Sequence, residues 1–342
     1  MTAKSCINKT LHNLYIAYTL DFTFIFYHKD EINLRNKFER KINNMKKTIS
    51  LSLMVIMIFS FIVGCTPTED SSGSETLGEF DTSKTINVVS REDGSGTRGA
   101  FVEIVGVLEK DAEGNEVDRT YDEAIIQNGT NAVMTTVQGD KYSIGYISLG
   151  SLNDTVKAVN INGAEATSNN VQNGSYKIAR PFNVAYQDNL SPLGKDFLDF
   201  ILSSEGQAIV VEEGYVQVST DLSPYDGSNQ EGNLVVAGST SVTPVMEKLA
   251  EAYEGLHSSV SIEIQSTGSS AGMQSAIEGS ADIGMASRDL KDSEKEKLSY
   301  EVVAIDGIAV IVNNENIVED ISLDNVKSIY TGEVTSWDEI IK

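Results

Sequence analysis

One short pattern constrains this chain more than any other, because it occurs three times. A β-rich run ends in a turn of glycine, serine and threonine, and a helical pattern of apolar residues follows; the turns cover residues 90–97, 238–244 and 266–270. Apolar residues at three- and four-residue spacing predict helices with one buried face. Because β-rich and helical runs alternate along the chain, we expect an α/β architecture with mostly parallel sheets.

The expected elements follow from the same periodicities. At 342 residues the chain is long enough for two lobes with a core each. We expect strands over residues 86–89, 143–147, 234–237, 260–265 and 302–312. We expect helices over residues 101–108, 197–212, 244–254 and 271–278.

Turns of this kind can bind an anion. The start of a helix leaves about four N–H groups unpaired and carries roughly half an elementary positive charge. Glycine lets the backbone approach a ligand closely, and serine and threonine hydroxyls add donors. Serine and threonine are also common helix caps, so any one turn could be a cap and nothing more. Three turns of one composition favour a shared anion site.

Arg91 adds a positive charge to the first of these turns. Its planar guanidinium can donate two parallel hydrogen bonds to one tetrahedral oxyanion. Asp93, two residues further on, could orient the arginine. The alternative is a surface ion pair worth under about 1 kcal/mol.

Composition argues against several classes of protein. The formal net charge of −24 argues against nucleic acid as a partner, because phosphate backbones attract clustered lysine and arginine. It does not exclude a small anion, since distant surface charges are screened within about 10 Å. Beyond residue 64 the chain holds one histidine, His257, which argues against a serine–histidine hydrolase and a multi-histidine metal site. We therefore predict no catalytic residues, no metal and no cofactor.

The beginning of the chain carries an export signal. Lys46 and Lys47 precede an apolar run that ends at Cys65, and this run is too short for a typical membrane span. An uncleaved anchor helix is the alternative. We expect translation to start at Met45, with residues 1–44 a mis-annotated extension, residues 45–64 the signal peptide and residues 65–84 a flexible tether. The only other cysteine is Cys6, so the exported protein must fold without disulfides.

Two resemblances to known proteins extend this reading. Ile62, Val63, Gly64 and Cys65 resemble the lipobox of bacterial lipoprotein signals, which implies acylation of Cys65 and a lipid anchor on the outer face of the cell membrane. Residues 89–97 closely resemble phosphate-binding proteins of phosphate-specific ABC importers. Further segments similar to that family are residues 191–215, 238–244, 268–272, 281–288 and 328–338.

This resemblance spans residues 85–342 and implies a type II periplasmic-binding-protein fold, in which a two-strand hinge joins two α/β lobes around the anion. Lobe A would comprise residues 85–185 and 306–342, and lobe B residues 186–305. In most of the family the turn at residues 238–244 comes before the turn at residues 90–97, so the domain looks circularly permuted. The alternative is a fragment of a tandem pair.

The resemblance also implies the site residues. Arg91, Ser95, Gly96 and Thr97 match the anion-binding loop, in which Asp93 would brace the arginine. The other matching positions are Thr240, Ser241, Val242 and Ser269. The family often has an aspartate that accepts a proton from phosphate where this chain has Ser287 or Arg288. Two alternatives are open for Asp306 in the hinge: a substitute for that aspartate, or an ordinary hinge cap.

The function implied is capture of inorganic phosphate by a monomer, which delivers it to an ABC permease and ATPase without chemistry. The departure at Ser287 leaves sulfate and molybdate open as ligands. A surface sensor or adhesin that uses the fold without a transporter is a further alternative. A phosphoester hydrolase is disfavoured by the scarcity of histidines and metal ligands.

Overall fold

The computed structural model describes residues 80–227 and 229–341. The chain divides into two units, residues 1–75 and 76–342, and every described residue belongs to the second. The predicted extension, the signal peptide, Cys65 and most of the tether therefore lie outside the described residues. None of the described helices is both long enough and apolar enough to cross a membrane.

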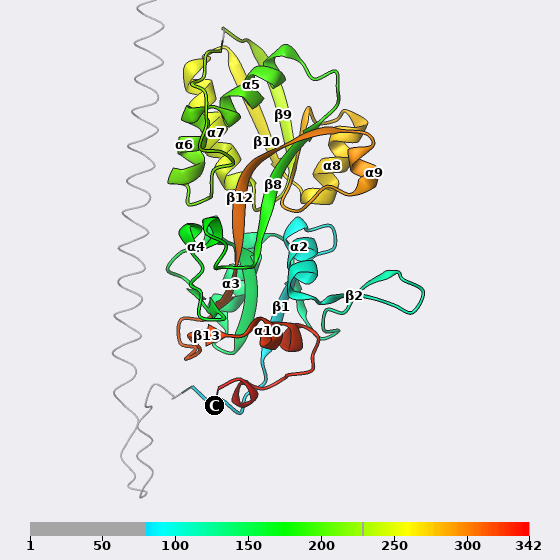
Figure 1. Cartoon of the computed structure of the whole chain (residues 1–342), viewed down its shortest axis with the longest axis vertical. Helices are drawn as coiled ribbons and strands as arrows, with labels where there is room; N and C mark the ends of the chain where they lie inside the picture. Colours follow the sequence, from blue (N-terminus) through cyan, green and yellow to red (C-terminus); the bar gives the residue numbers. More distant parts are fainter. Residues whose placement is uncertain (1–79, 228, 342) are drawn as a thin grey trace, which may run out of the picture. The chain divides into compact units, whose positions relative to one another are not determined.

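One nine-stranded sheet runs through the described unit in the order β10-β9-β11-β8-β12-β5-β1-β4, with β6 beside β12 (Figure 1). Its strands are β1 (Asn87–Arg91), β4 (Ile125–Gln127), β5 (Ser143–Ser148), β6 (Lys157–Ala158), β8 (Ala179–Tyr186), β9 (Gly232–Gly238), β10 (Val260–Ser266), β11 (Ile283–Ala286) and β12 (Ser299–Val312). Two small pairs join β2 (Leu108–Lys110) to β3 (Glu116–Asp118) and β7 (Asn160–Ile161) to β13 (Asp320–Ile321).

Strand directions correct the expectation of mostly parallel sheets. Parallel pairing holds where β1 meets β4 and β5, and where β9 meets β10 and β11. The long strands β8 and β12 are antiparallel to each other and to their other neighbours. The physical reason is that β8 carries the chain from one core to the other and β12 brings it back.

The helices are α2 (Gly96–Val105), α3 (Thr130–Gly139), α4 (Ser168–Gln172), α5 (Pro192–Leu202), α6 (Ser204–Glu212), α7 (Thr243–Leu256), α8 (Ser269–Glu278), α9 (Asp292–Lys295) and α10 (Leu323–Tyr330), with short 3-10 turns at Leu149–Ser151 and Trp337–Glu339. The helix expected over residues 197–212 is two helices, because Ser203 is extended and caps α6 by accepting a hydrogen bond from the Gly206 N–H. The helix expected over 101–108 begins at Gly96 and ends before Gly106, whose φ of 81° stops it. We did not predict α3.

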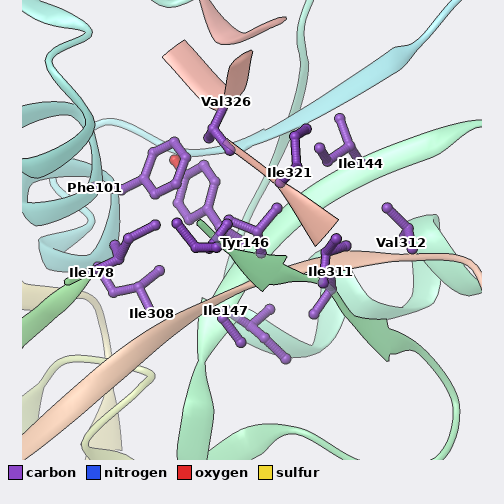
Figure 2. Close-up of a cluster of buried hydrophobic side chains, with 14 of the residues drawn as sticks. Phe101, Ile144, Tyr146, Ile147, Ile178, Ile308, Ile311, Val312, Ile321 and Val326 are labelled. Carbon is purple, nitrogen blue, oxygen red and sulfur yellow. The ribbon is translucent and has the colours of Figure 1, made fainter. Parts of the chain in front are cut away.

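Two large hydrophobic cores divide the described unit, and we call the parts around them lobe A and lobe B. A third, smaller cluster in lobe B comprises Ala185, Met273, Ala276, Ala286, Leu290 and Leu298. Figure 2 shows part of the lobe A core, where Phe101 stacks on Tyr146 with ring centroids 3.9 Å apart. The lobe B core includes Phe182, Phe197, Phe200, Leu234, Met246, Tyr253, Met285 and Ala304. At β8 the buried side chains pass from the lobe A core to the lobe B core between Ile178 and Phe182. Along β12 they pass back to the lobe A core between Ala304 and Ile308. We call these two stretches the hinge.

The two ends of the described domain lie together. Thr85 forms an antiparallel bridge with Ser336, and the Ile86 N–H donates to the Thr335 carbonyl at 2.8 Å. Adjacent ends are what a circular permutation requires. The permutation itself stays a prediction.

Candidate anion-binding site

The three turns singled out in the sequence meet where lobe A faces lobe B. Arg91 Nη2 donates to Thr240 Oγ1 at 3.0 Å, and Thr97 Oγ1 lies 2.8 Å from Ser241 Oγ. The third turn joins them through a backbone bond of 3.1 Å from the Ser270 N–H to the Gly94 carbonyl. The structure therefore brings the starts of α2, α7 and α8 to one place.

The first turn is shaped for close approach between the lobes. Ser95 caps α2 by accepting from the Arg98 N–H at 3.3 Å, and its hydroxyl hydrogen is still able to donate. A Cβ built on Gly96 would overlap Ser269 Oγ and would lie 2.7 Å from Ser287 Oγ. Glycine at position 96 thus lets the backbone of lobe A reach the hydroxyls of lobe B.

Arg91 is held by Glu92. Its side chain is 1% exposed, and its Nε and Nη2 donate to the two carboxylate oxygens of Glu92 at 2.7 and 2.8 Å. Its Nη1 is buried and has no hydrogen-bond partner among the described residues. Burial works to raise the pKa of Glu92, but the hydrogen bond and charge of Arg91 outweigh it and hold the pKa below its usual value. The arginine is therefore fixed by a carboxylate that stays ionised.

This pairing corrects the expectation that Asp93 braces the arginine. Asp93 lies beyond the end of β1, its side chain is 98% exposed, and it pairs with Arg98 at 3.1 Å. The longer side chain of Glu92, directly after the strand, reaches the guanidinium instead.

Lobe B contributes a cluster of buried hydroxyls. Ser239 Oγ donates to Ser287 Oγ at 2.8 Å, and the Ser287 N–H donates to Ser269 Oγ at 3.2 Å. Of the two residues at the family's aspartate position, Ser287 is therefore the one in the cluster. Arg288 donates to both carboxylate oxygens of Glu294 at 2.8 Å. The positive charge of Arg288 is therefore already paired within lobe B.

Two predicted site residues make other contacts in this structure. The Val242 side chain packs in the lobe B core, and its N–H donates to the Ser239 carbonyl at 3.2 Å, because the turn closes on itself there. Asp306 pairs with Arg180 at 3.0 Å in the hinge, opposite it in the register of β8 and β12. Burial outweighs the attraction of Arg180 and raises the pKa of Asp306 to about 6.

The structure also brings in residues that the sequence analysis missed. Thr130, at the start of α3, places its hydroxyl 3.4 Å from both Thr240 Oγ1 and Ser241 Oγ. Before it, the Gly129 N–H donates to Glu92 Oε2 at 3.2 Å. The missed signal is a fourth strand–turn–helix pattern, from β4 into α3, with only one glycine and one threonine in its turn.

The arrangement suits an oxyanion. It combines a guanidinium, several helix starts and hydroxyls from both lobes, all of which can donate hydrogen bonds to negative oxygen. Among residues 80–227 and 229–341, no group of three or more histidine, cysteine, aspartate or glutamate side chains is placed to hold a metal ion.

Comparison with known proteins agrees with this geometry. The PBP superfamily domain matches residues 74–205 and 223–341. Phosphate-binding protein PstS 2 of Streptococcus agalactiae serotype V is 47% identical over 303 residues, which are 87% of this chain and 100% of that protein. Phosphate-binding protein PstS 2 of Streptococcus pneumoniae serotype 4 is 43% identical over 295 residues, 86% of this chain and 99% of its own length.

A solved structure shares the fold. It is the crystal structure of a phosphate-binding protein of a phosphate ABC transporter from Streptococcus pneumoniae TIGR4, with a TM-score of 0.62 and 47% identity over 75% of this chain and 99% of that chain. The predicted α/β periplasmic-binding-protein fold is thereby confirmed. The chain belongs to the PBP superfamily and, within it, to the family of the phosphate-binding proteins PstS.

Proposed function

We propose that this chain captures inorganic phosphate and delivers it to the permease and ATPase of an ABC importer. The observation that carries the proposal is the buried Arg91, whose Nη1 has no hydrogen-bond partner among the described residues and whose Nη2 donates to the Thr240 hydroxyl of lobe B. The names of the relatives, which are 43–47% identical over most of this chain, favour phosphate over sulfate or molybdate.

The supply of donors matches the cost of burying such a ligand. A multiply charged anion can leave water only where nearly every oxygen finds a hydrogen-bond donor. Arg91 Nη1 and the hydroxyls of Thr97, Ser241, Ser269 and Ser287 supply donors from both sides. Because these groups belong to both lobes, ligand binding favours the closed arrangement.

The family is one of solute-binding proteins, and we expect no turnover from this member. His257 is the only histidine among the described residues, and its Nε2 lies 2.8 Å from the Tyr225 hydroxyl in lobe B. It is therefore bonded outside the hydroxyl cluster. We also propose that the protein is exported as a monomer and anchored by an acylated Cys65, because the lipobox-like segment precedes the folded unit.

Calorimetric titration of the full-length chain tests the proposal, with phosphate, sulfate and molybdate added separately. We expect phosphate to bind most tightly. Arg91→Met should weaken phosphate binding about 100-fold or more, since truncating one partner of a buried charged contact costs roughly 2–5 kcal/mol.

Arg119→Met is the matched control, because Arg119 is exposed and its nearest carboxylate, on Glu109, lies 3.8 Å away. It should leave phosphate binding unchanged. Tighter binding of sulfate or molybdate, or equal phosphate affinity of Arg91→Met and the unaltered chain, would overturn the proposal.

A further inference from the structure

We propose that Thr130, at the start of α3, is a further anion-binding residue, and that Glu92 positions it together with Arg91. This inference rests on the proposed function. It adds a fourth strand–turn–helix unit to the three that the sequence pattern identified.

The position of the Thr130 hydroxyl carries the inference. Thr130 is 5% exposed, and Oγ1 lies 3.4 Å from Thr240 Oγ1 and 3.4 Å from Ser241 Oγ. These two lobe B atoms are the same ones that Arg91 Nη2 and Thr97 Oγ1 contact. Thr130 therefore lies against the atoms around which the other predicted ligands gather.

These contacts leave the hydroxyl able to serve a ligand. A separation of 3.4 Å is long for an O–H···O bond, whose usual range is about 2.5–3.0 Å. The helix start around it is not capped by a side chain, because the capping position is Gly129, with φ of 84°. The first N–H groups of α3 therefore add donors beside the Thr130 hydroxyl.

Arg91 supplies the second, independent observation. Its Nη1 is buried and finds no hydrogen-bond partner in the part of the chain that the structure describes, on the same guanidinium that donates to Thr240. A buried donor without an acceptor destabilises the fold, so an acceptor is expected at this place. An oxyanion there would lie within reach of both the guanidinium and the start of α3.

Glu92 links these two parts. Its Oε2 accepts from Arg91 Nε at 2.7 Å and from the Gly129 N–H at 3.2 Å, and its Oε1 accepts from Arg91 Nη2 at 2.8 Å. One ionised carboxylate thus fixes the guanidinium and the start of α3 relative to each other. Glu92 acts through its neighbours and is a positioning residue.

Thr130→Val tests the binding role, because valine keeps the volume and removes only the hydroxyl. We expect the phosphate dissociation constant to rise about tenfold or more, since a hydrogen bond to a charged group contributes roughly 1.5–3 kcal/mol. The melting temperature without phosphate should stay unchanged. The matched control is Thr136→Val on the same helix, whose hydroxyl donates to the Ala132 carbonyl, and its phosphate affinity should equal that of the unaltered chain.

A double-mutant cycle with Glu92→Gln tests the positioning role. If Glu92 holds α3 in place for the ligand, Thr130→Val should weaken binding by a much smaller factor in the Glu92→Gln background. An equal factor in both backgrounds overturns the positioning role. A Thr130→Val dissociation constant within about twofold of the unaltered value, a difference of under roughly 0.5 kcal/mol, overturns the binding role.

The outcomes also separate this inference from the proposed function. Suppose that the unaltered chain binds phosphate, that Arg91→Met does not, and that Thr130→Val binds it with unchanged affinity. In that case only the inference about α3 fails. If the unaltered chain does not bind phosphate, both fail.

Discussion

The candidate anion site and the hinge each contain an arginine whose side chain is 1% exposed, yet the two arginines are paired in different ways. Arg91 donates two hydrogen bonds to Glu92, whose side chain is 22% exposed. Arg180 donates one, from Nη2 to Asp306 at 3.0 Å, and Asp306 is itself only 1% exposed. Asp306 Oδ1 and two further nitrogens of Arg180 are buried, and none of them has a hydrogen-bond partner within residues 80–227 and 229–341.

The two carboxylates respond in opposite directions. Glu92 keeps part of its hydration and gains two bonds from Arg91, so its pKa lies below the usual value despite burial. Asp306 has lost its hydration, and burial raises its pKa to about 6 and lowers the pKa of Arg180. Burial of an arginine is therefore no evidence of a ligand site by itself. What distinguishes Arg91 is that its guanidinium also donates to the Thr240 hydroxyl across the boundary between the lobes, whereas Arg180 lies against Asp306 and the Phe182 ring.

The largest effect that separates the two arginines should be on stability. Arg180→Met leaves the Asp306 carboxylate buried alone and should lower the free energy of unfolding by about 3–5 kcal/mol. Arg91→Met leaves the Glu92 carboxylate, which is 22% exposed, partly hydrated, and should lower it by a smaller amount, about 1–3 kcal/mol. Urea unfolding of both variants in phosphate-free buffer measures the difference.

A variant that removes both hinge partners is the control for this prediction. Arg180→Met combined with Asp306→Leu replaces the pair by apolar side chains and should recover most of the lost stability, because no uncompensated charge is left. Equal losses for Arg180→Met and Arg91→Met, or no recovery in the double variant, would contradict the contrast between hinge and site.

The next effect tests the site without touching any charge. Gly96→Ala would push a methyl group into Ser269 Oγ and to within 2.7 Å of Ser287 Oγ, across the boundary between the lobes. We expect phosphate affinity to fall about 100-fold, or roughly 2.7 kcal/mol, because such overpacking opposes closure of the lobes. Gly96 has no positive φ, so alanine fits the helix start and the free energy of unfolding should hardly change.

Gly99→Ala is the matched control on the same helix. Its added Cβ would lie 3.5 Å from Arg288 Cδ, an ordinary van der Waals distance, so phosphate affinity should be retained. Calorimetric titration of both variants decides the matter. Equal affinities would mean that closure does not depend on close approach at position 96.

The sequence could predict those features that lie within one short segment. The turns, their helices and the strand before each are local patterns, and Arg91, Ser95, Gly96 and Thr97 follow from one turn. Even there, the sequence analysis named Asp93 as the partner of Arg91 and did not consider Glu92. That choice depends on where β1 ends, and a boundary of one or two residues is below what periodicity resolves.

What it could not predict depends on contacts between distant segments. Thr130 belongs to a single Gly-Thr pair, and such pairs are too common in sequences to indicate a site. Only the structure shows that Thr130 lies beside Thr240. Arg180 and Asp306 are 126 residues apart and meet only through the register of β8 and β12. No local pattern in either segment gives that register.

The smallest expected effect is on the pH dependence of stability, and here the two carboxylates should differ in sign. The pKa of Asp306 is raised from 3.8 to about 6, so the folded chain holds this proton more tightly than the unfolded chain does. That contribution to stability is complete below pH 3.8 and is lost as the pH rises through about 6. Relative to Asp306→Asn, the unaltered chain should therefore lose stability across this window.

Glu92 gives the opposite expectation. Its pKa is lowered from 4.5, so its contribution to stability is present above that value and is lost as the pH falls through the folded pKa. Relative to Glu92→Gln, the unaltered chain should gain stability as the pH rises. Urea unfolding of the three proteins along one pH series gives two difference curves, which should slope in opposite directions. If both curves slope the same way, the hinge carboxylate is ionised like the one at the site, and the electrostatic contrast between the two arginines is wrong.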